Sequence, residues 1–87
     1  GMKRVQFFHF VGCPYCSAAE RWVSEVLKEH PELAGLSIER IDEHVNPEIA
    51  NRYDYWFVPT FYVEGKKVHE GACTKKIVER VLLSALE

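Results

Sequence analysis

Between residues 5 and 30 the spacing of the apolar residues changes abruptly. Residues 5–10 form an apolar and aromatic run, bounded by charges before it and by Gly12 after it, which is typical of a buried strand. Farther on, apolar residues recur every three or four positions, as on one face of a helix: Ala19, Trp22, Val23, Val26 and Leu27. Pro31 discourages helix before it, so this helix should end near His30. A buried strand that leads into an amphipathic helix predicts an α/β fold.

The middle of the chain predicts a second strand and a second helix. Residues 36–42 alternate in part between apolar and polar side chains, which favours a strand. Asn46 suits an N-cap, and Pro47 suits the first position of a helix. We therefore expect a short helix from this pair to about Tyr53.

The last third predicts a hairpin and a final helix. Residues 60–64 and 67–70 flank Gly65–Lys66, which indicates a two-residue turn in which glycine supplies the positive φ. Thr74 can cap a helix, whose apolar face is Ile77, Val78, Val81, Leu82, Ala85 and Leu86.

The predicted order is β-α-β-α-β-β-α. The first two strands should be parallel with a right-handed crossover, and the last two should form an antiparallel pair. A four-stranded mixed sheet with helices on both faces would bury every apolar stripe. We interpret Gly1 before Met2 as a remnant of an expression tag, so residues 2–87 form the single expected domain.

Composition excludes several classes of function. A net charge of −2 gives no electrostatic footprint for nucleic acid. No apolar run approaches the roughly 20 residues of a membrane span, and Met2–Lys3–Arg4 leads directly into a strand rather than into a signal peptide. The odd count of three cysteines fits a reducing compartment, so we expect a cytoplasmic protein.

The sequence Cys13–Pro14–Tyr15–Cys16 lies between the first strand and the first helix. There the first sulfur meets unpaired backbone N–H groups and the positive end of the helix dipole, which favour a thiolate. Pro14 suits the first helical turn, and Tyr15 is either a contact for partners or a simple spacer. Two intervening residues let the sulfurs meet, so Cys13 is predicted to attack a disulfide and Cys16, shielded inside the helix, to resolve the product. A CxxC can also be half of a zinc site, but the remaining cysteine and histidines lack paired ligand spacing, so no metal site is predicted.

A second feature is Val58–Pro59–Thr60, which precedes the third strand. Pro59 could be a trans proline at a strand start, or a cis proline that leaves the Val58 backbone free to pair with an extended substrate. Either Trp56 or Phe57 could remain exposed as an apolar collar for partner proteins.

Two other residues have alternative interpretations. His9 is expected to be half-buried and hydrogen-bonded, with a proton relay as the alternative. Cys73 is expected to be a small, partly buried hydrophobe, with an additional redox cysteine as the alternative.

About residues 3–86 resemble the thioredoxin-fold superfamily. Cys13–Pro14–Tyr15–Cys16 is similar to the active site of dithiol glutaredoxins, whereas the second half resembles thioredoxin at Ile41–Asp42, Asn46–Pro47, Tyr53, Val58–Pro59–Thr60 and Gly71. The resemblance implies a thiol–disulfide oxidoreductase, either a protein-disulfide reductase or a glutaredoxin-like enzyme, active in electron transport and cell redox homeostasis. It also implies that Pro59 is cis and packs beside the cysteines.

The chain departs from both relatives. Phe10 stands where glutaredoxins usually carry a basic residue, and the segment from Gly71 to Lys75 lacks their acidic residue. Phe7 stands where thioredoxins carry a buried Asp, and Gly12 where they carry a Trp. Proton transfer must then rely on another group, with His9 or a water as the nearby candidates.

These departures shape the expected partners. We expect no tightly bound cofactor, and either glutathione or a thioredoxin-reductase-type donor as electron source, with the reductase favoured. The substrates are expected to be disulfide-bearing proteins or low-molecular-weight disulfides, and the protein is expected to be a monomer. The alternatives are an iron–sulfur or other metal-binding module, as some glutaredoxin-like proteins are, and a non-catalytic binding domain.

Overall fold

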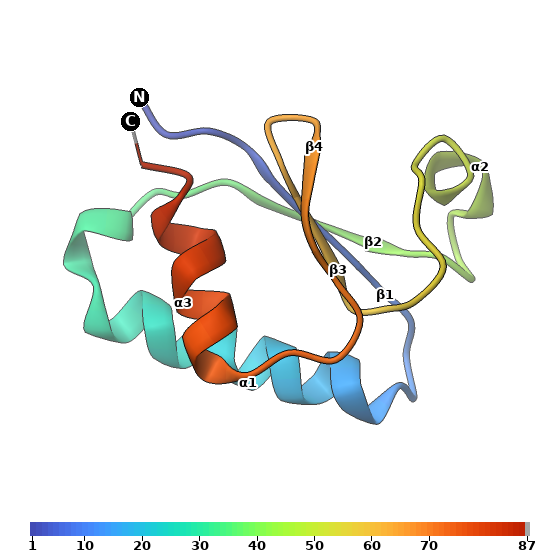
Figure 1. The fold of residues 1–87 in the computed structure, drawn as a ribbon, viewed down its shortest axis with the longest axis horizontal. Coiled ribbons are helices and arrows are strands. Elements are labelled where there is room, and N and C mark those ends of the chain that lie inside the picture. Colours follow the sequence, from blue (N-terminus) through green and yellow to red (C-terminus); the bar gives the residue numbers. More distant parts are fainter. Residues whose placement is uncertain (87) are drawn as a thin grey trace.

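The computed structural model describes residues 1–86, and its elements follow the predicted order (Figure 1). They are β1 (Val5–His9), α1 (Pro14–Glu29), the short 3₁₀ helix η1 (Pro31–Leu33), β2 (Ile38–Asp42), α2 (Pro47–Ala50), β3 (Thr60–Val63), β4 (Lys66–Glu70) and α3 (Lys75–Leu83). Within this part of the chain, no helix has the length and apolar character needed to cross a membrane.

The strands form one four-stranded sheet in the order β2-β1-β3-β4. β1 runs parallel to β2 and antiparallel to β3, and β3 pairs antiparallel with β4. The predicted mixed sheet is therefore confirmed. The register pairs Phe8 with Thr60, so the end of β1 and the start of β3 lie at the same end of the sheet.

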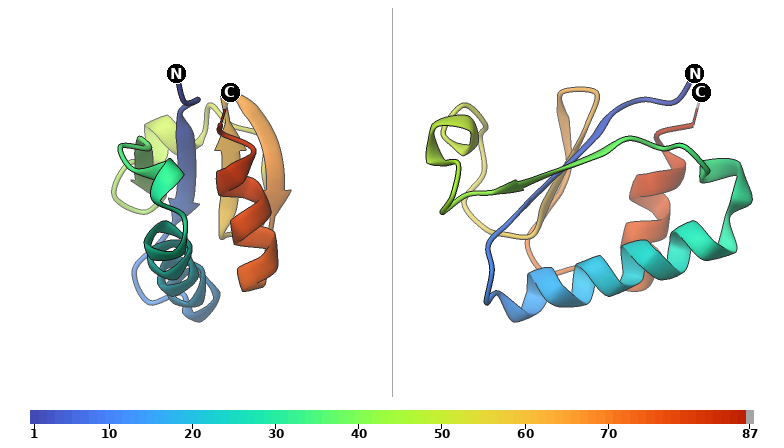
Figure 2. Two further views of the ribbon diagram at one scale, coloured as in Figure 1. Left: turned by 90° about the vertical axis from the view of Figure 1, so that its left-hand side faces the viewer. Right: turned by 180° about the vertical axis from the view of Figure 1, so that it is seen from behind.

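Helices cover both faces of the sheet, as predicted. α1 and α3 pack together on one face, and α2 lies on the other (Figure 2). Because side chains alternate along a strand, the neighbours Phe7 and Phe8 enter opposite cores. The larger core includes Phe7, Val23, Val26, Leu33, Phe61, Val78, Val81 and Leu82, and the smaller one is built from Phe8, Ile41, Ala50 and Tyr62.

α2 is shorter than predicted, because it ends at Ala50 rather than near Tyr53. The side chain of Asn46 makes no capping hydrogen bond. Residues 51–53 form turns that direct the Tyr53 ring onto Phe8, with 4.8 Å between ring centroids. This packing, together with a hydrogen bond from Gln6 to the Tyr53 hydroxyl, holds the chain out of a longer helix.

The hairpin turn is one residue earlier than predicted. Glu64 and Gly65 are its two central residues, with φ of 51° and 79°, and Val63 pairs with Lys66. Positive φ at both central positions is the requirement of a type I′ turn, whose twist matches that of the flanking strands. α3 also ends earlier than its apolar pattern, at Leu83, although Ala85 remains fully buried.

Candidate active site

Cys13 immediately precedes α1 and is its N-cap residue. The chain reaches it through a tight turn in which the Cys13 N–H donates to the Phe10 carbonyl, 3.3 Å away. Gly12 has a φ of 95° in this turn, a conformation that side chains strain. This requirement accounts for glycine directly before Cys13, and Pro14 then begins the helix as predicted.

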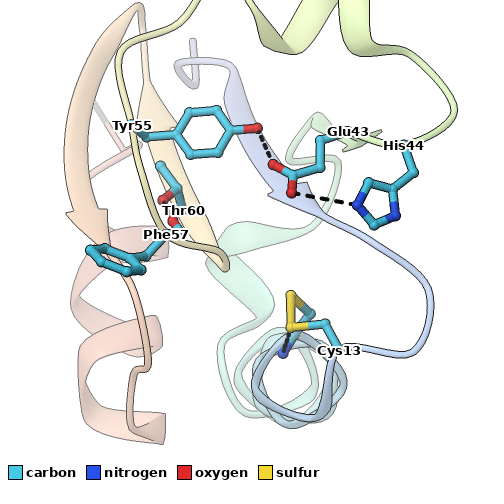
Figure 3. Close-up of a disulfide and its surroundings, with 7 residues drawn as sticks. Cys13, Glu43, His44, Tyr55, Phe57 and Thr60 are labelled. Carbon is cyan, nitrogen blue, oxygen red and sulfur yellow. Dashed lines mark hydrogen bonds and ion pairs between the residues drawn. A yellow bond between two sulfur atoms is a disulfide. The ribbon is translucent and has the colours of Figure 1, made fainter.

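The two cysteines of the motif are joined in a disulfide across the first turn of α1 (Figure 3). Their Cα atoms are 5.2 Å apart, and the Cys16 N–H donates to the Cys13 Sγ at 3.2 Å. Both side chains are almost fully covered, at 4% exposure each. Cys16 is thus shielded as predicted, and in this disulfide form Cys13 is covered to the same extent.

The Val58–Pro59 peptide bond is cis. Since Thr60 pairs with Phe8, Pro59 lies at the end of the sheet from which β1 leads to Cys13. The Thr60 hydroxyl donates to the Phe57 carbonyl, on the segment that Figure 3 shows across from the disulfide. Within residues 1–86, the backbone N–H and carbonyl of Val58 make no hydrogen bond.

Glu70, at the end of β4, holds the segment before Pro59. Its carboxylate accepts the N–H groups of Trp56 and Phe57 at 2.5 and 2.9 Å, and the ammonium of Lys67 at 2.7 Å. The bond from Lys67 and the two backbone N–H groups lower the pKa of Glu70 to about 2. Sequence reasoning missed this residue, because a lone Glu in a strand carries no motif.

Exposed apolar side chains surround the disulfide end of the sheet. Trp56 is 86% exposed. Val11, Tyr15 and Phe57 are also large apolar residues that face solvent. Both candidates for an apolar collar, Trp56 and Phe57, are therefore exposed.

Unlike these exposed residues, Tyr55 and Cys73 are partly buried. Tyr55 turns inward and donates its hydroxyl to Glu43 (Figure 3) at 2.7 Å; burial and that contact raise the Tyr55 pKa. Cys73 is half-buried against the larger core, and burial raises its pKa to about 11. This environment favours the interpretation of Cys73 as a small hydrophobe.

His9 lies beside the cysteine pair, at the end of β1. Its ring stacks on Phe7 with 5.4 Å between centroids, and it is half-buried. In the described part of the chain, no side-chain hydrogen bond to another residue involves His9, so a hydrogen bond of its ring stays a prediction. Likewise, residues 1–86 contain no group of three or more His, Cys, Asp or Glu residues arranged to hold a metal ion.

The sheet, the cysteine pair at a helix start and the proline opposite it define a dithiol–disulfide protein. A family profile described as "Thioredoxin domain" matches residues 4–83. The chain belongs to this thioredoxin family, as the resemblance of its sequence predicted.

Individual relatives agree with the family. A thioredoxin from Methanocaldococcus jannaschii is 35% identical over 79 residues, which cover 90% of this chain and 91% of the relative. The solution structure of a thioredoxin-like protein from Clostridium perfringens has a TM-score of 0.70 at 32% identity, covering 98% of this chain and 71% of the other. Oxidised thioredoxin from Plasmodium falciparum has the same fold, with a TM-score of 0.73 at 18% identity and coverage of 99% and 84%. Family and cysteine pair together support thiol–disulfide oxidoreductase chemistry.

Proposed function

We propose that this protein reduces disulfide bonds in other proteins, with Cys13 as the attacking thiolate and Cys16 as the resolving thiol. The observation that carries the proposal is the position of the Cys13 sulfur, which caps α1 and accepts the Cys16 N–H. Unpaired N–H groups and the positive end of the helix dipole stabilise a negative sulfur there. A stabilised thiolate is both available for attack and a good leaving group.

The reaction has two exchange steps. The Cys13 thiolate attacks one sulfur of the substrate disulfide, so that a mixed disulfide forms and one substrate thiolate leaves. The Cys16 sulfur then attacks Cys13, which forms the intramolecular disulfide and releases the second substrate thiolate. Two electrons pass from the cysteine pair to the substrate, and an external donor must restore the dithiol.

The surroundings of the pair favour an extended polypeptide as substrate. The free N–H and carbonyl of Val58 can pair with a substrate backbone, as in recognition by strand addition. Trp56, Phe57 and Tyr15 offer exposed aromatic surface on either side, and aromatic residues are enriched where proteins bind one another. These contacts favour disulfides in proteins over small disulfides.

Two residues favour a thioredoxin-reductase-type electron donor over glutathione. Phe10 stacks on His44, with 4.5 Å between centroids, and offers no positive charge to a glutathione carboxylate. Lys75 belongs to the segment in which glutaredoxins carry an acidic residue, and its ammonium is instead paired with Glu25 and Glu29 of α1, at 3.1 and 2.7 Å. We expect faster turnover with NADPH and a thioredoxin reductase than with glutathione and its reductase. Saturation at low glutathione with a high rate would contradict this choice of donor. A reductase-coupled role would place the protein in the reducing cytoplasm.

The reaction is tested by insulin reduction with dithiothreitol as electron source. Cys13→Ser should fall to the background rate of dithiothreitol, and serine is itself a good N-cap, so α1 should remain intact. Cys16→Ser should accumulate a mixed disulfide with substrate, detectable by mass spectrometry. Cys73→Ser is the matched control, because it removes a cysteine outside the pair, and should keep the wild-type rate. Reduction by Cys13→Ser at the wild-type rate would disprove the proposal.

A further inference from the structure

Cys16 lines a hollow that Cys13 does not reach. The hollow has a volume of about 240 Å³ and is lined by residues of β1, the turn of residues 10–12 and α1. Its polar side chains include His9 and Glu20. Since a water molecule takes about 30 Å³ in the liquid, the hollow has room for several waters between these groups.

Charged groups from the neighbouring elements surround His9. Asp42 is its register partner on β2, and partners in adjacent strands share a face of the sheet. Arg40 lies two residues earlier on that face, and its guanidinium donates two hydrogen bonds to the Glu20 carboxylate of α1, at 2.6 and 2.9 Å. The Arg40 bond lowers the pKa of Glu20 although burial opposes it, and the charge of His9 adds to the lowering. Two carboxylates therefore lie near His9, and both have other partners: Glu20 is paired with Arg40, and Asp42 accepts the backbone N–H groups of His44 and Val45.

We propose that His9 accepts the proton of Cys16, through water in this hollow, when Cys16 resolves the mixed disulfide. The inference rests on the proposed function, because it concerns the second exchange step of that reaction. A thiol must lose its proton before it attacks. Among the side chains of the hollow, histidine is the type that exchanges a proton near neutral pH, whereas Glu20 is committed to Arg40.

The step balances without another reactant. The Cys16 thiol gives its proton to the His9 ring, which becomes an imidazolium. The Cys16 thiolate attacks the Cys13 Sγ, the bond between these sulfurs forms, and the bond from Cys13 to the substrate sulfur breaks. The electron pair of that bond leaves with the substrate as a thiolate, and the imidazolium returns its proton to water.

The surroundings of His9 suit this role. Its ring is positioned by the stack on Phe7, and within residues 1–86 its nitrogens form no side-chain hydrogen bond that would compete with water. Glu20 lines the same hollow, and Asp42 is the register partner of His9 on β2.

The test follows the two steps separately by stopped flow with 5,5′-dithiobis(2-nitrobenzoate), in a Cys73→Ser background. The first thionitrobenzoate is released when Cys13 is modified, and the second when Cys16 resolves that mixed disulfide. In His9→Gln the second release should slow about 100-fold at pH 7, a typical general-base contribution, and added imidazole should restore much of the rate. The first release should stay within about twofold, because His9 is outside that step.

His44→Gln is the matched control, since His44 also stacks on an aromatic residue of this region but lies outside the hollow; it should change neither release. The proposal is overturned if His9→Gln follows the wild type from pH 5 to 9, or if both releases slow alike without rescue by imidazole. A wild-type protein that gives the first release without the second would instead disprove the proposed function.

Discussion

The Tyr62 hydroxyl ties β3 to the segment that carries Pro59. It donates to the Asp54 carbonyl at 2.7 Å and accepts the Asp54 N–H at 3.1 Å. Tyr62→Phe removes both bonds and keeps the ring, which packs against Phe8 and Tyr53. Each neutral hydrogen bond contributes about 1 kcal/mol to stability, and water can reach the exposed Asp54. We therefore expect a loss of about 1–2 kcal/mol in the free energy of unfolding.

Urea denaturation of the oxidised protein, followed by tryptophan fluorescence, measures this loss. The midpoint should fall while the m-value stays unchanged, and the melting temperature should drop by about 4–16 °C for a domain of this size. Tyr15→Phe is the matched control: Tyr15 is exposed, so the same chemical change there should cost less than about 0.5 kcal/mol. Equal, negligible losses in both variants would refute the reasoning, because water would then replace the Asp54 bonds completely.

Three further predictions concern groups with shifted pKa values. Because the pKa of Glu70 is lowered to about 2, its contribution to the free energy of unfolding is present above pH 4.5 and is lost as the pH falls toward 2. Glu70→Gln should therefore reduce the difference between the urea midpoints at pH 5 and pH 2.5. An unchanged difference would contradict the prediction. Hydrogen bonds to Glu79, the larger cause, and to Glu32 raise the pKa of His30. The contribution of His30 to the free energy of unfolding is therefore present below pH 6.5 and is lost as the pH rises through the pKa of the folded state. The urea midpoint of His30→Gln should therefore change less between pH 6 and 8.5 than that of the wild type. An equal change in both proteins would argue against these contacts. Because the pKa of Cys73 is raised to about 11, iodoacetamide at pH 8 should label Cys73 in urea but scarcely in the native protein; fast native labelling would show that the thiol is reactive.

Local sequence signals predicted the element order and much of the cysteine environment. The run of residues 5–10 and the helical spacing after Gly12 identify β1 and α1, because periodicity reports which face is buried. Pro14 and the CxxC spacing place both sulfurs in the first turn of α1. These signals act over a few residues, so no tertiary structure is needed to interpret them.

What could not be predicted depends on contacts between distant residues. Glu70 reaches Trp56 and Phe57 only because the β3–β4 register brings the end of β4 beside that segment. The early end of α2 results from the packing of Tyr53 on Phe8. The turn at Glu64 was placed one residue late, since a non-glycine residue with positive φ has no distinct sequence signal.

The Cys13 sulfur is the cap of α1 as well as the reacting atom, and this double use joins helix stability to oxidation state. In the disulfide form the Cys13 sulfur accepts the Cys16 N–H; a Cys13 thiolate would accept it as a charge-assisted hydrogen bond, which is about twice as strong as a neutral one. Reduction therefore tightens the first turn of the helix, and oxidation weakens it. In a closed thermodynamic cycle, the free energy by which the stronger hydrogen bond stabilises the helix in the reduced protein also stabilises the dithiol relative to the disulfide. The backbone at the start of α1 is thus part of the redox couple, and loosening it would make the protein a stronger reductant.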